Sequence, residues 1–146
     1  MMKKLMLTIA TTGLAFLSVS LSSCVTSQID PTSITTATAL KARTVALANK
    51  ALEPYPTHVA DITALNTDLE AAYDHEKGRT LNTQTIAQWD LLIHKSATDA
   101  SSGIWPRFLE HWQKKGTLKS GTIQDNAQDI GAAFDKIISL ENSKTH

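Results

Sequence analysis

Apolar side chains recur at helical spacing through almost all of the chain after residue 30. The clearest example lies between Thr57, which can cap a helix, and Gly78, which can stop one. Its periodic positions are Val59, Ile62, Leu65, Leu69, Ala72, Tyr73 and Glu76. A repeat of three or four residues places these side chains on one face of a helix, and that face must pack against other elements. Because no stretch shows the alternation typical of β-strands, the sequence predicts an all-α fold.

Prolines, glycines and capping residues divide this pattern into five helices. Asp30 before Pro31 is typical of a helix start, and the first predicted helix runs to Leu52, just before two closely spaced prolines. The further predicted helices span residues 58–77, 83–95, 106–115 and 122–140, with a mobile loop over 97–103. We expect a small helical bundle of four longer helices plus one short helix, the one at 106–115. It would form a single domain over residues 31–141, followed by a frayed tail over 142–146.

The first two dozen residues show a different pattern. Lys3 and Lys4 precede an apolar run from Leu5 to Leu21, which is interrupted by hydroxyl side chains. A comfortable membrane span needs about 20 mostly apolar residues, so this run is too short and too polar. A basic start, an apolar run and then small residues are typical of a secretory signal. We therefore expect residues 1–23 to be a cleaved leader.

The stretch Leu21-Ser22-Ser23-Cys24 resembles the lipobox of bacterial lipoproteins, an aliphatic residue and two small residues before a modified cysteine. The resemblance implies cleavage between Ser23 and Cys24, a diacylglycerol thioether on Cys24 and, in many bacteria, acylation of the new amino group. Cys24 is the only cysteine, and lipidation would remove a lone reactive thiol from an exported chain. The alternative is an ordinary cysteine beside an unlipidated cleavage site.

This resemblance also implies a location. Residues 24–30 would be the lipidated cysteine and a short tether, and two or three acyl chains hold a protein stably on a bilayer. Val25 stands where an Asp would signal inner-membrane retention in enteric lipoproteins. We therefore expect a lipid-anchored protein of the bacterial cell envelope, on the periplasmic face of the outer membrane where the host has one. We expect no cofactor besides the covalent lipid on Cys24.

Charge narrows the range of partners. The full chain has 14 basic and 14 acidic residues, and loss of Lys3 and Lys4 would leave a mature net charge of −2. No basic stripe appears, which argues against a nucleic-acid partner and against a polybasic hold on anionic lipid. The remaining 123 residues suffice for one domain with a core, and a lone cysteine allows no disulfide within the chain.

Two histidine–carboxylate pairs deserve a chemical interpretation. His58 and Asp61 are spaced i,i+3, and Asp90 and His94 are spaced i,i+4. Neither pair supplies the three or four ligands of a zinc site, so we expect a solvated surface and no metal. Asp90 and His94 could also orient a nucleophilic serine, but no Gly-x-Ser-x-Gly turn accompanies them. A surface ion pair explains the spacing, and we expect no catalytic residue here.

Three tryptophans lie within 24 residues of one another. Trp89 and Trp112 fall on apolar stripes, so we expect them in the core. Trp105 lies beside the expected loop and could contact a ligand or a partner, with Arg107 and His111 at the rim of such a site.

Three functional hypotheses remain. The first is a membrane-anchored, non-enzymatic envelope lipoprotein whose helical domain binds an envelope protein or has a structural role. The second is a cell-wall-directed enzyme or enzyme modulator, acting near Asp90, His94 and Trp105. The third is a phage-derived lipoprotein that alters host permeability. We favour the first, because the anchor pattern is strong and no catalytic motif accompanies it.

Overall fold

The computed structural model describes residues 27–94 and 103–144, so Ser23, Cys24, the leader and most of the predicted 97–103 loop lie outside the described residues. The described residues contain five α-helices and two short 3-10 helices, and no β-strand. These elements are α1 (Pro31–Ala48), η1 (Asn49–Leu52), η2 (Tyr55–His58), α2 (Val59–Lys77), α3 (Thr83–Ile93), α4 (Ile104–Lys115) and α5 (Ser120–Asn142). The predicted all-α fold is confirmed.

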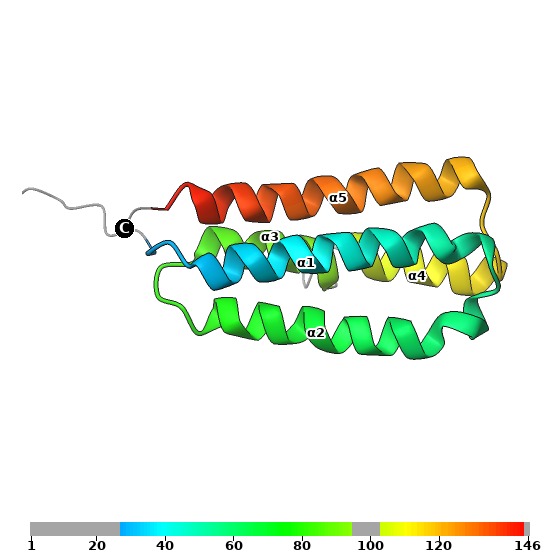
Figure 1. Ribbon diagram of the computed structural model, residues 1–146, viewed down its shortest axis with the longest axis horizontal. Helices are drawn as coiled ribbons and strands as arrows, with labels where there is room; N and C mark the ends of the chain where they lie inside the picture. The colour runs from blue at the N-terminus through cyan, green and yellow to red at the C-terminus, as the bar shows by residue number, and fades with distance from the viewer. Residues whose placement is uncertain (1–26, 95–102, 145–146) are drawn as a thin grey trace, which may run out of the picture.

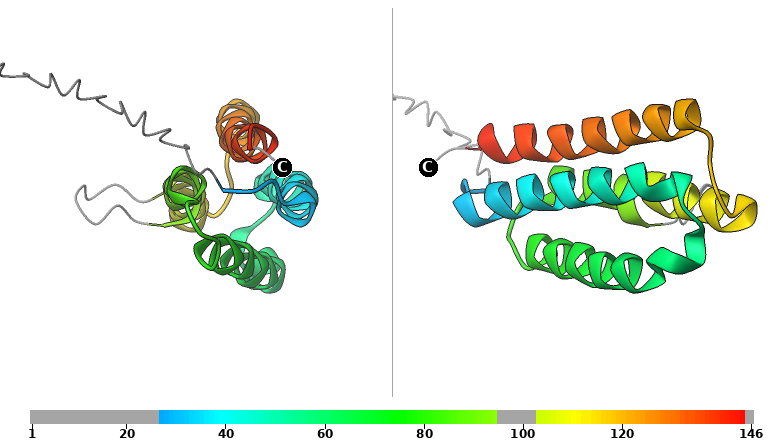
Figure 2. Two further views of the ribbon diagram at one scale, coloured as in Figure 1. Left: turned by 90° about the vertical axis from the view of Figure 1, so that its left-hand side faces the viewer. Right: turned by 45° about the vertical axis from the view of Figure 1, so that its right-hand side comes forward.

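The helices form a four-rod, up-down-up-down bundle in which one rod is split. α1 packs between α5 and α2, and α3 packs against the other sides of α5 and α2 (Figure 1). α4 continues the direction of α3, so the two share the fourth rod (Figure 2). α4, expected to be the short helix, spans 12 residues against 11 for α3. A confirmed helical bundle is therefore built from three long helices and two half-length ones.

The split in the fourth rod depends on a close backbone approach. At His94 the chain turns extended (φ −112°, ψ 161°), which ends α3. A Cβ atom on Gly103 would lie 2.7 Å from the carbonyl oxygen of His94 and 2.9 Å from that of Leu92. Only glycine fits such an approach without displacing the backbone. The end of α3 and the start of α4 therefore lie in direct contact.

The core runs along the whole bundle and contains all three tryptophans. Trp89 packs edge-on against Phe134 of α5, with ring centroids 5.8 Å apart. Trp112 and Trp105 pack on either side of Phe108. The predicted core positions of Trp89 and Trp112 are confirmed. Among the described residues, no helix is both long enough and apolar enough to cross a bilayer.

Several helix boundaries differ from the prediction: α1 ends at Ala48, before the short helix η1, and α3 ends at Ile93. α1 begins as predicted, with Pro31 at its first position and the Asp30 carboxylate accepting from the amide of Thr32 at 2.9 Å. α4 begins at Ile104, because Pro106 is tolerated in a first helical turn, where its missing N–H breaks no bond. α5 begins at Ser120 and runs through Asn142.

Candidate functional site

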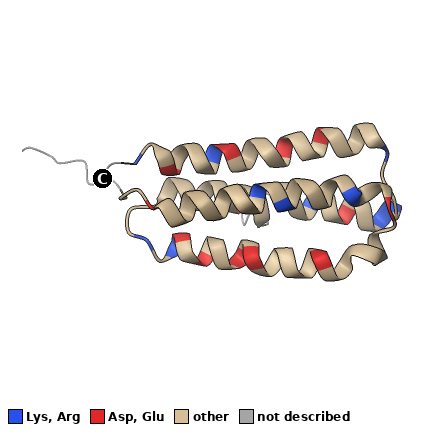
Figure 3. Ribbon diagram, in the orientation of Figure 1, with Lys and Arg blue, Asp and Glu red and all other residues tan. Residues whose placement is uncertain are grey.

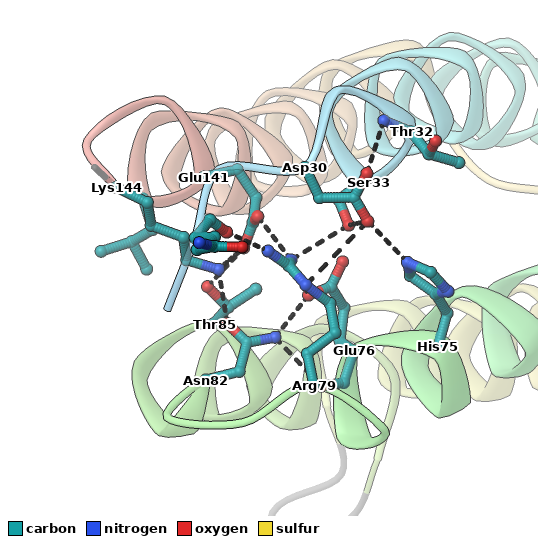
Figure 4. A network of polar contacts seen from close by, with 12 residues as sticks. Asp30, Thr32, Ser33, His75, Glu76, Arg79, Asn82, Thr85, Glu141 and Lys144 are labelled. Atoms are coloured by element: carbon teal, nitrogen blue, oxygen red, sulfur yellow. Dashed lines mark hydrogen bonds and ion pairs between the residues drawn. The ribbon is translucent and has the colours of Figure 1, made fainter. Parts of the chain in front are cut away.

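Both ends of the described chain meet at one end of the bundle. The residues before α1, the α2–α3 connection and the end of α5 lie together there (Figure 1). Figure 4 shows the polar side chains that join these segments. We call this group the Arg79 cluster; its members are Asp30, Ser33, His75, Glu76, Arg79, Asn82, Thr85, Glu141 and Lys144.

Arg79 lies at the centre of the cluster. Its Nη1 donates to Oε2 of Glu76 at 2.8 Å and to Oε2 of Glu141 at 2.7 Å, and also reaches the hydroxyl of Ser33 at 3.1 Å. Its Nη2 donates to the backbone carbonyl of Gln28. The rigid fork of guanidinium donors allows one side chain to serve partners in several directions. Arg79 therefore links the segment before α1 to the helices α1, α2 and α5.

Two buried carboxylates balance the positive charges. Glu141 is 0% exposed and Glu76 is 3% exposed, which is rare for glutamate unless it is paired. Glu141 accepts from Arg79, from the hydroxyl of Thr85 at 2.8 Å and from the ammonium of Lys144. Burial favours the neutral acid, but the hydrogen bonds from Lys144, Arg79 and Thr85 outweigh burial and lower the pKa of Glu141.

The same balance holds for the cation. Burial on its own would lower the pKa of Arg79, but the hydrogen bonds to Glu141 and Glu76 outweigh burial and raise it. Arg79 and Glu141 are therefore both charged at neutral pH. Removing either one would leave an uncompensated charge in a buried place.

Asp30 ties the cluster to the chain's entry point. Its Oδ2 lies 2.8 Å from Nε2 of His75, and its carboxylate also accepts from Thr32 and Ser33. The hydrogen bond with His75 is the main reason that the pKa of Asp30 lies well below its ordinary value, with smaller contributions from Thr32, Ser33 and Arg79 against the effect of burial. Asp30 thus caps α1 and joins it to α2.

The Arg79 cluster acts as a clamp, by which we mean that its hydrogen bonds hold neighbouring segments of the chain together. Each of its three carboxylates accepts at least two hydrogen bonds from protein groups. A general base needs a free lone pair within reach of a substrate proton, and these carboxylates are committed to the fold. The cluster holds residues 27–30, which precede α1 and which we call the entry segment. Ser27 is buried, and the Gln28 carbonyl is bound by Arg79.

A surface pocket of about 350 Å³ lies beside the clamp. Its lining includes Ser27 from the entry segment, Leu81 from the α2–α3 connection and Lys144 from the end of α5. Leu81 has a positive φ of 58°, and its side chain is 59% exposed.

The three residues predicted to contact a ligand do not share a face. Trp105 is buried, and its indole N–H donates to Oδ1 of Asn66 at 2.8 Å. Arg107 and His111 lie on the exposed side of α4. Contact of these residues with a ligand or a partner stays a prediction, and the indole of Trp105 has a packing role in the fold.

The predicted ion pair of Asp90 and His94 is present. Nδ1 of His94 lies 3.1 Å from Asp90, and Nε2 lies 3.0 Å from Glu70 on α2. In a serine hydrolase the second ring nitrogen faces the nucleophile, whereas here it faces a carboxylate. The ring also packs against Tyr73, with centroids 4.4 Å apart. Burial and the neighbouring Asp90 raise the pKa of Tyr73 to about 12, which keeps its hydroxyl protonated.

His58 corrects one prediction. It was expected on a solvated surface, yet its side chain is buried against the ring of Trp112, with centroids 5.4 Å apart. Nε2 of His58 lies 2.9 Å from Glu53, while Asp61 is more distant at 3.8 Å. Within residues 27–94 and 103–144, no group of three or more histidine, cysteine or acidic side chains is arranged to hold a metal ion.

No protein-family model, curated protein or solved structure matches this chain. Sequence analysis did not identify the Arg79 cluster, although one signal was present. Glu76 continues the apolar stripe of α2, and Glu141 follows Phe134 and Ile137 at the same helical spacing in α5. A charged residue on an apolar stripe indicates a buried partner of opposite charge.

Proposed function

We propose that this protein is a membrane-anchored envelope lipoprotein whose helical bundle has a binding or structural role. The observation that supports this proposal best is the clamp on the entry segment. Ser27 lies three positions after Cys24, and three extended residue steps span at most about 10 Å. A lipid on Cys24 would therefore hold the bundle end-on, close to the bilayer.

A clamped entry segment suits a binding or structural protein. A long flexible linker would let the domain sample many orientations, whereas a bound one fixes which end faces the membrane. The helices then extend away from the bilayer, and the opposite end of the bundle, near η1 and η2, points into the space beyond. A partner would meet that end and the sides of the bundle in a constant orientation.

The side-chain chemistry also favours this role over catalysis. The carboxylates of the Arg79 cluster accept several internal hydrogen bonds each. Both ring nitrogens of His94 lie within hydrogen-bond distance of carboxylates, Nδ1 of Asp90 and Nε2 of Glu70. Neither nitrogen therefore faces a free space in which a substrate proton could lie.

The anchor is tested by replacing its sulfur. Cells that express Cys24→Ala should incorporate no radiolabelled palmitate into the protein and should accumulate uncleaved precursor. Ser23→Ala is the matched control, because alanine is also small and should leave lipidation intact. Palmitate labelling of the Cys24→Ala protein at the wild-type level would refute the proposal.

The proposed binding or structural role is tested by comparing substitutions at the Asp90–His94 pair with substitutions on the exposed face of α4. Asp90→Asn and His94→Ala should leave the envelope phenotype and partner cross-linking unchanged, because these residues form a surface ion pair. Loss of the phenotype with retained helical structure would instead support the alternative of a cell-wall-directed enzyme. Arg107→Ala combined with His111→Ala tests the predicted contact surface by the same cross-linking assay.

A further inference from the structure

Leu81 combines a backbone conformation that leucine rarely adopts with an exposed side chain. Its φ of 58° is the only positive φ of a non-glycine residue within the described ranges. Glycine, asparagine and aspartate adopt this left-handed conformation far more readily than leucine does. Its side chain is nevertheless 59% exposed, so no burial in the core compensates for the backbone conformation. Backbone strain of this kind indicates a functional constraint at that position.

The position of Leu81 suggests what that constraint is. Leu81 lines the same pocket as Ser27 and Lys144, at the end of the bundle from which the chain continues toward Cys24. The three residue steps from Ser27 to Cys24 reach about 10 Å at most. The interfacial layer of a bilayer is of similar depth, since apolar faces bind about 5–10 Å into it. A lipid on Cys24 therefore brings Leu81 to the level of the headgroups.

The charges at this end do not oppose contact with lipid. Arg79 and Lys144 together balance Glu76 and Glu141, and the third carboxylate, that of Asp30, faces His75. Figure 3 shows that basic and acidic positions alternate closely along the ribbon at this end. Among the described residues, an approaching bilayer surface would therefore meet paired charges and the exposed side chain of Leu81.

We infer that the Arg79 end of the bundle rests directly on the lipid bilayer, with the side chain of Leu81 inserted between headgroups. This inference rests on the proposed lipidation of Cys24. One leucine alone would bind a membrane only weakly, so the lipid anchor supplies the affinity. Leu81 then fixes the tilt and rotation of the bundle on the bilayer.

Leu52 provides a matched comparison. It is the same residue type, it is 60% exposed, and it lies in η1 at the opposite end of the bundle. Leu81→Cys and Leu52→Cys would each introduce a single free thiol into the lipidated protein, because the only native cysteine carries the lipid. Both positions are exposed, so an environment-sensitive fluorophore such as NBD can be attached without disturbing the core.

The experiment uses the full lipidated protein in vesicles of phosphatidylethanolamine with a minor share of phosphatidylglycerol. NBD at position 81 should shift to shorter wavelength and be quenched by lipids that carry a shallow spin label, and NBD at position 52 should do neither. Equal signals at the two positions, or a water-like signal at position 81, would overturn the inference. Mass spectrometry of the same sample separates the two proposals: a lipidated Cys24 with water-like NBD at position 81 refutes only the contact, whereas an unmodified Cys24 refutes both.

Discussion

The central prediction concerns the loss of Arg79. Replacing Arg79 by methionine keeps an unbranched side chain but removes the cation that pairs with both Glu76 and Glu141. Both carboxylates would remain buried, at 3% and 0% exposure, with fewer donors. The carbonyl of Gln28 would also lose its donor. Breaking a buried ion pair from one side costs about 3–5 kcal/mol of the free energy of unfolding.

Arg43 is the matched control for this variant. Its Nη1 lies 2.7 Å from Asp68, the same distance that separates Arg79 from Glu141. Arg43 and Asp68 are 51% and 50% exposed, however, so water replaces the lost partner and the expected cost of Arg43→Met is about 0–1 kcal/mol. For a domain of this size, these costs correspond to a fall in melting temperature of about 10–20 °C for Arg79→Met and at most about 5 °C for Arg43→Met.

Thermal unfolding followed by circular dichroism at 222 nm measures both variants. The double variant Arg79→Met with Glu141→Gln should recover part of the loss, because a neutral amide is easier to bury than an unpaired carboxylate. Equal melting temperatures for Arg79→Met and Arg43→Met would show that the cluster is solvated, and the account of the clamp would be wrong.

Three further predictions follow from single contacts. The carboxyl groups of Asp30 and Glu141 have pKa values below their ordinary values of 3.8 and 4.5, so their ionised forms stabilise the fold fully above those pH values. The melting temperature should therefore fall as the pH drops below about 4.5, and Asp30→Asn should reduce that fall. Leu81→Asn should raise the free energy of unfolding by about 0.5–1 kcal/mol in urea titrations, because asparagine tolerates the left-handed conformation, and a loss would show that the backbone there is unstrained. Gly103→Ala should lower the free energy of unfolding by about 1–3 kcal/mol, because the new methyl group would lie 2.7 Å from the carbonyl oxygen of His94. An unchanged free energy of unfolding would show that the α3–α4 junction is loosely packed.

The helices could be predicted from the sequence because each one carries its own apolar stripe and stop signals. Their boundaries were harder to predict, and α4 shows why. A start at Pro106 leaves Trp105 outside the helix, free to face a ligand. A start at Ile104 instead places Trp105, Phe108 and Trp112 at helical spacing on one buried stripe. The difference is one proline that the first helical turn tolerates.

The Arg79 cluster was harder still to predict, because it depends on tertiary contacts between residues far apart in the sequence. Arg79 and Glu141 are 62 positions apart, and Arg79 and Gln28 are 51 apart. Spacing on a single helix cannot reveal which ends of which helices meet. The positions of Glu76 and Glu141 on apolar stripes were the local signals, and each indicates a buried partner without identifying it.

The choice of ions at this end has a physical consequence for the proposed anchor. Apolar residues in place of a buried ion pair are often as stable or more stable, so stability alone does not require Arg79 and Glu141. The Arg79 guanidinium also donates to the backbone carbonyl of Gln28 and so holds the entry segment. Leucines at the three buried positions could close the bundle, but they would offer no donor to that carbonyl. Arg79→Leu combined with Glu76→Leu and Glu141→Leu should therefore retain a cooperative melt, while an NBD probe at position 81 loses its defined depth in vesicles; an unchanged quenching profile would show that the ions have no part in orienting the bundle.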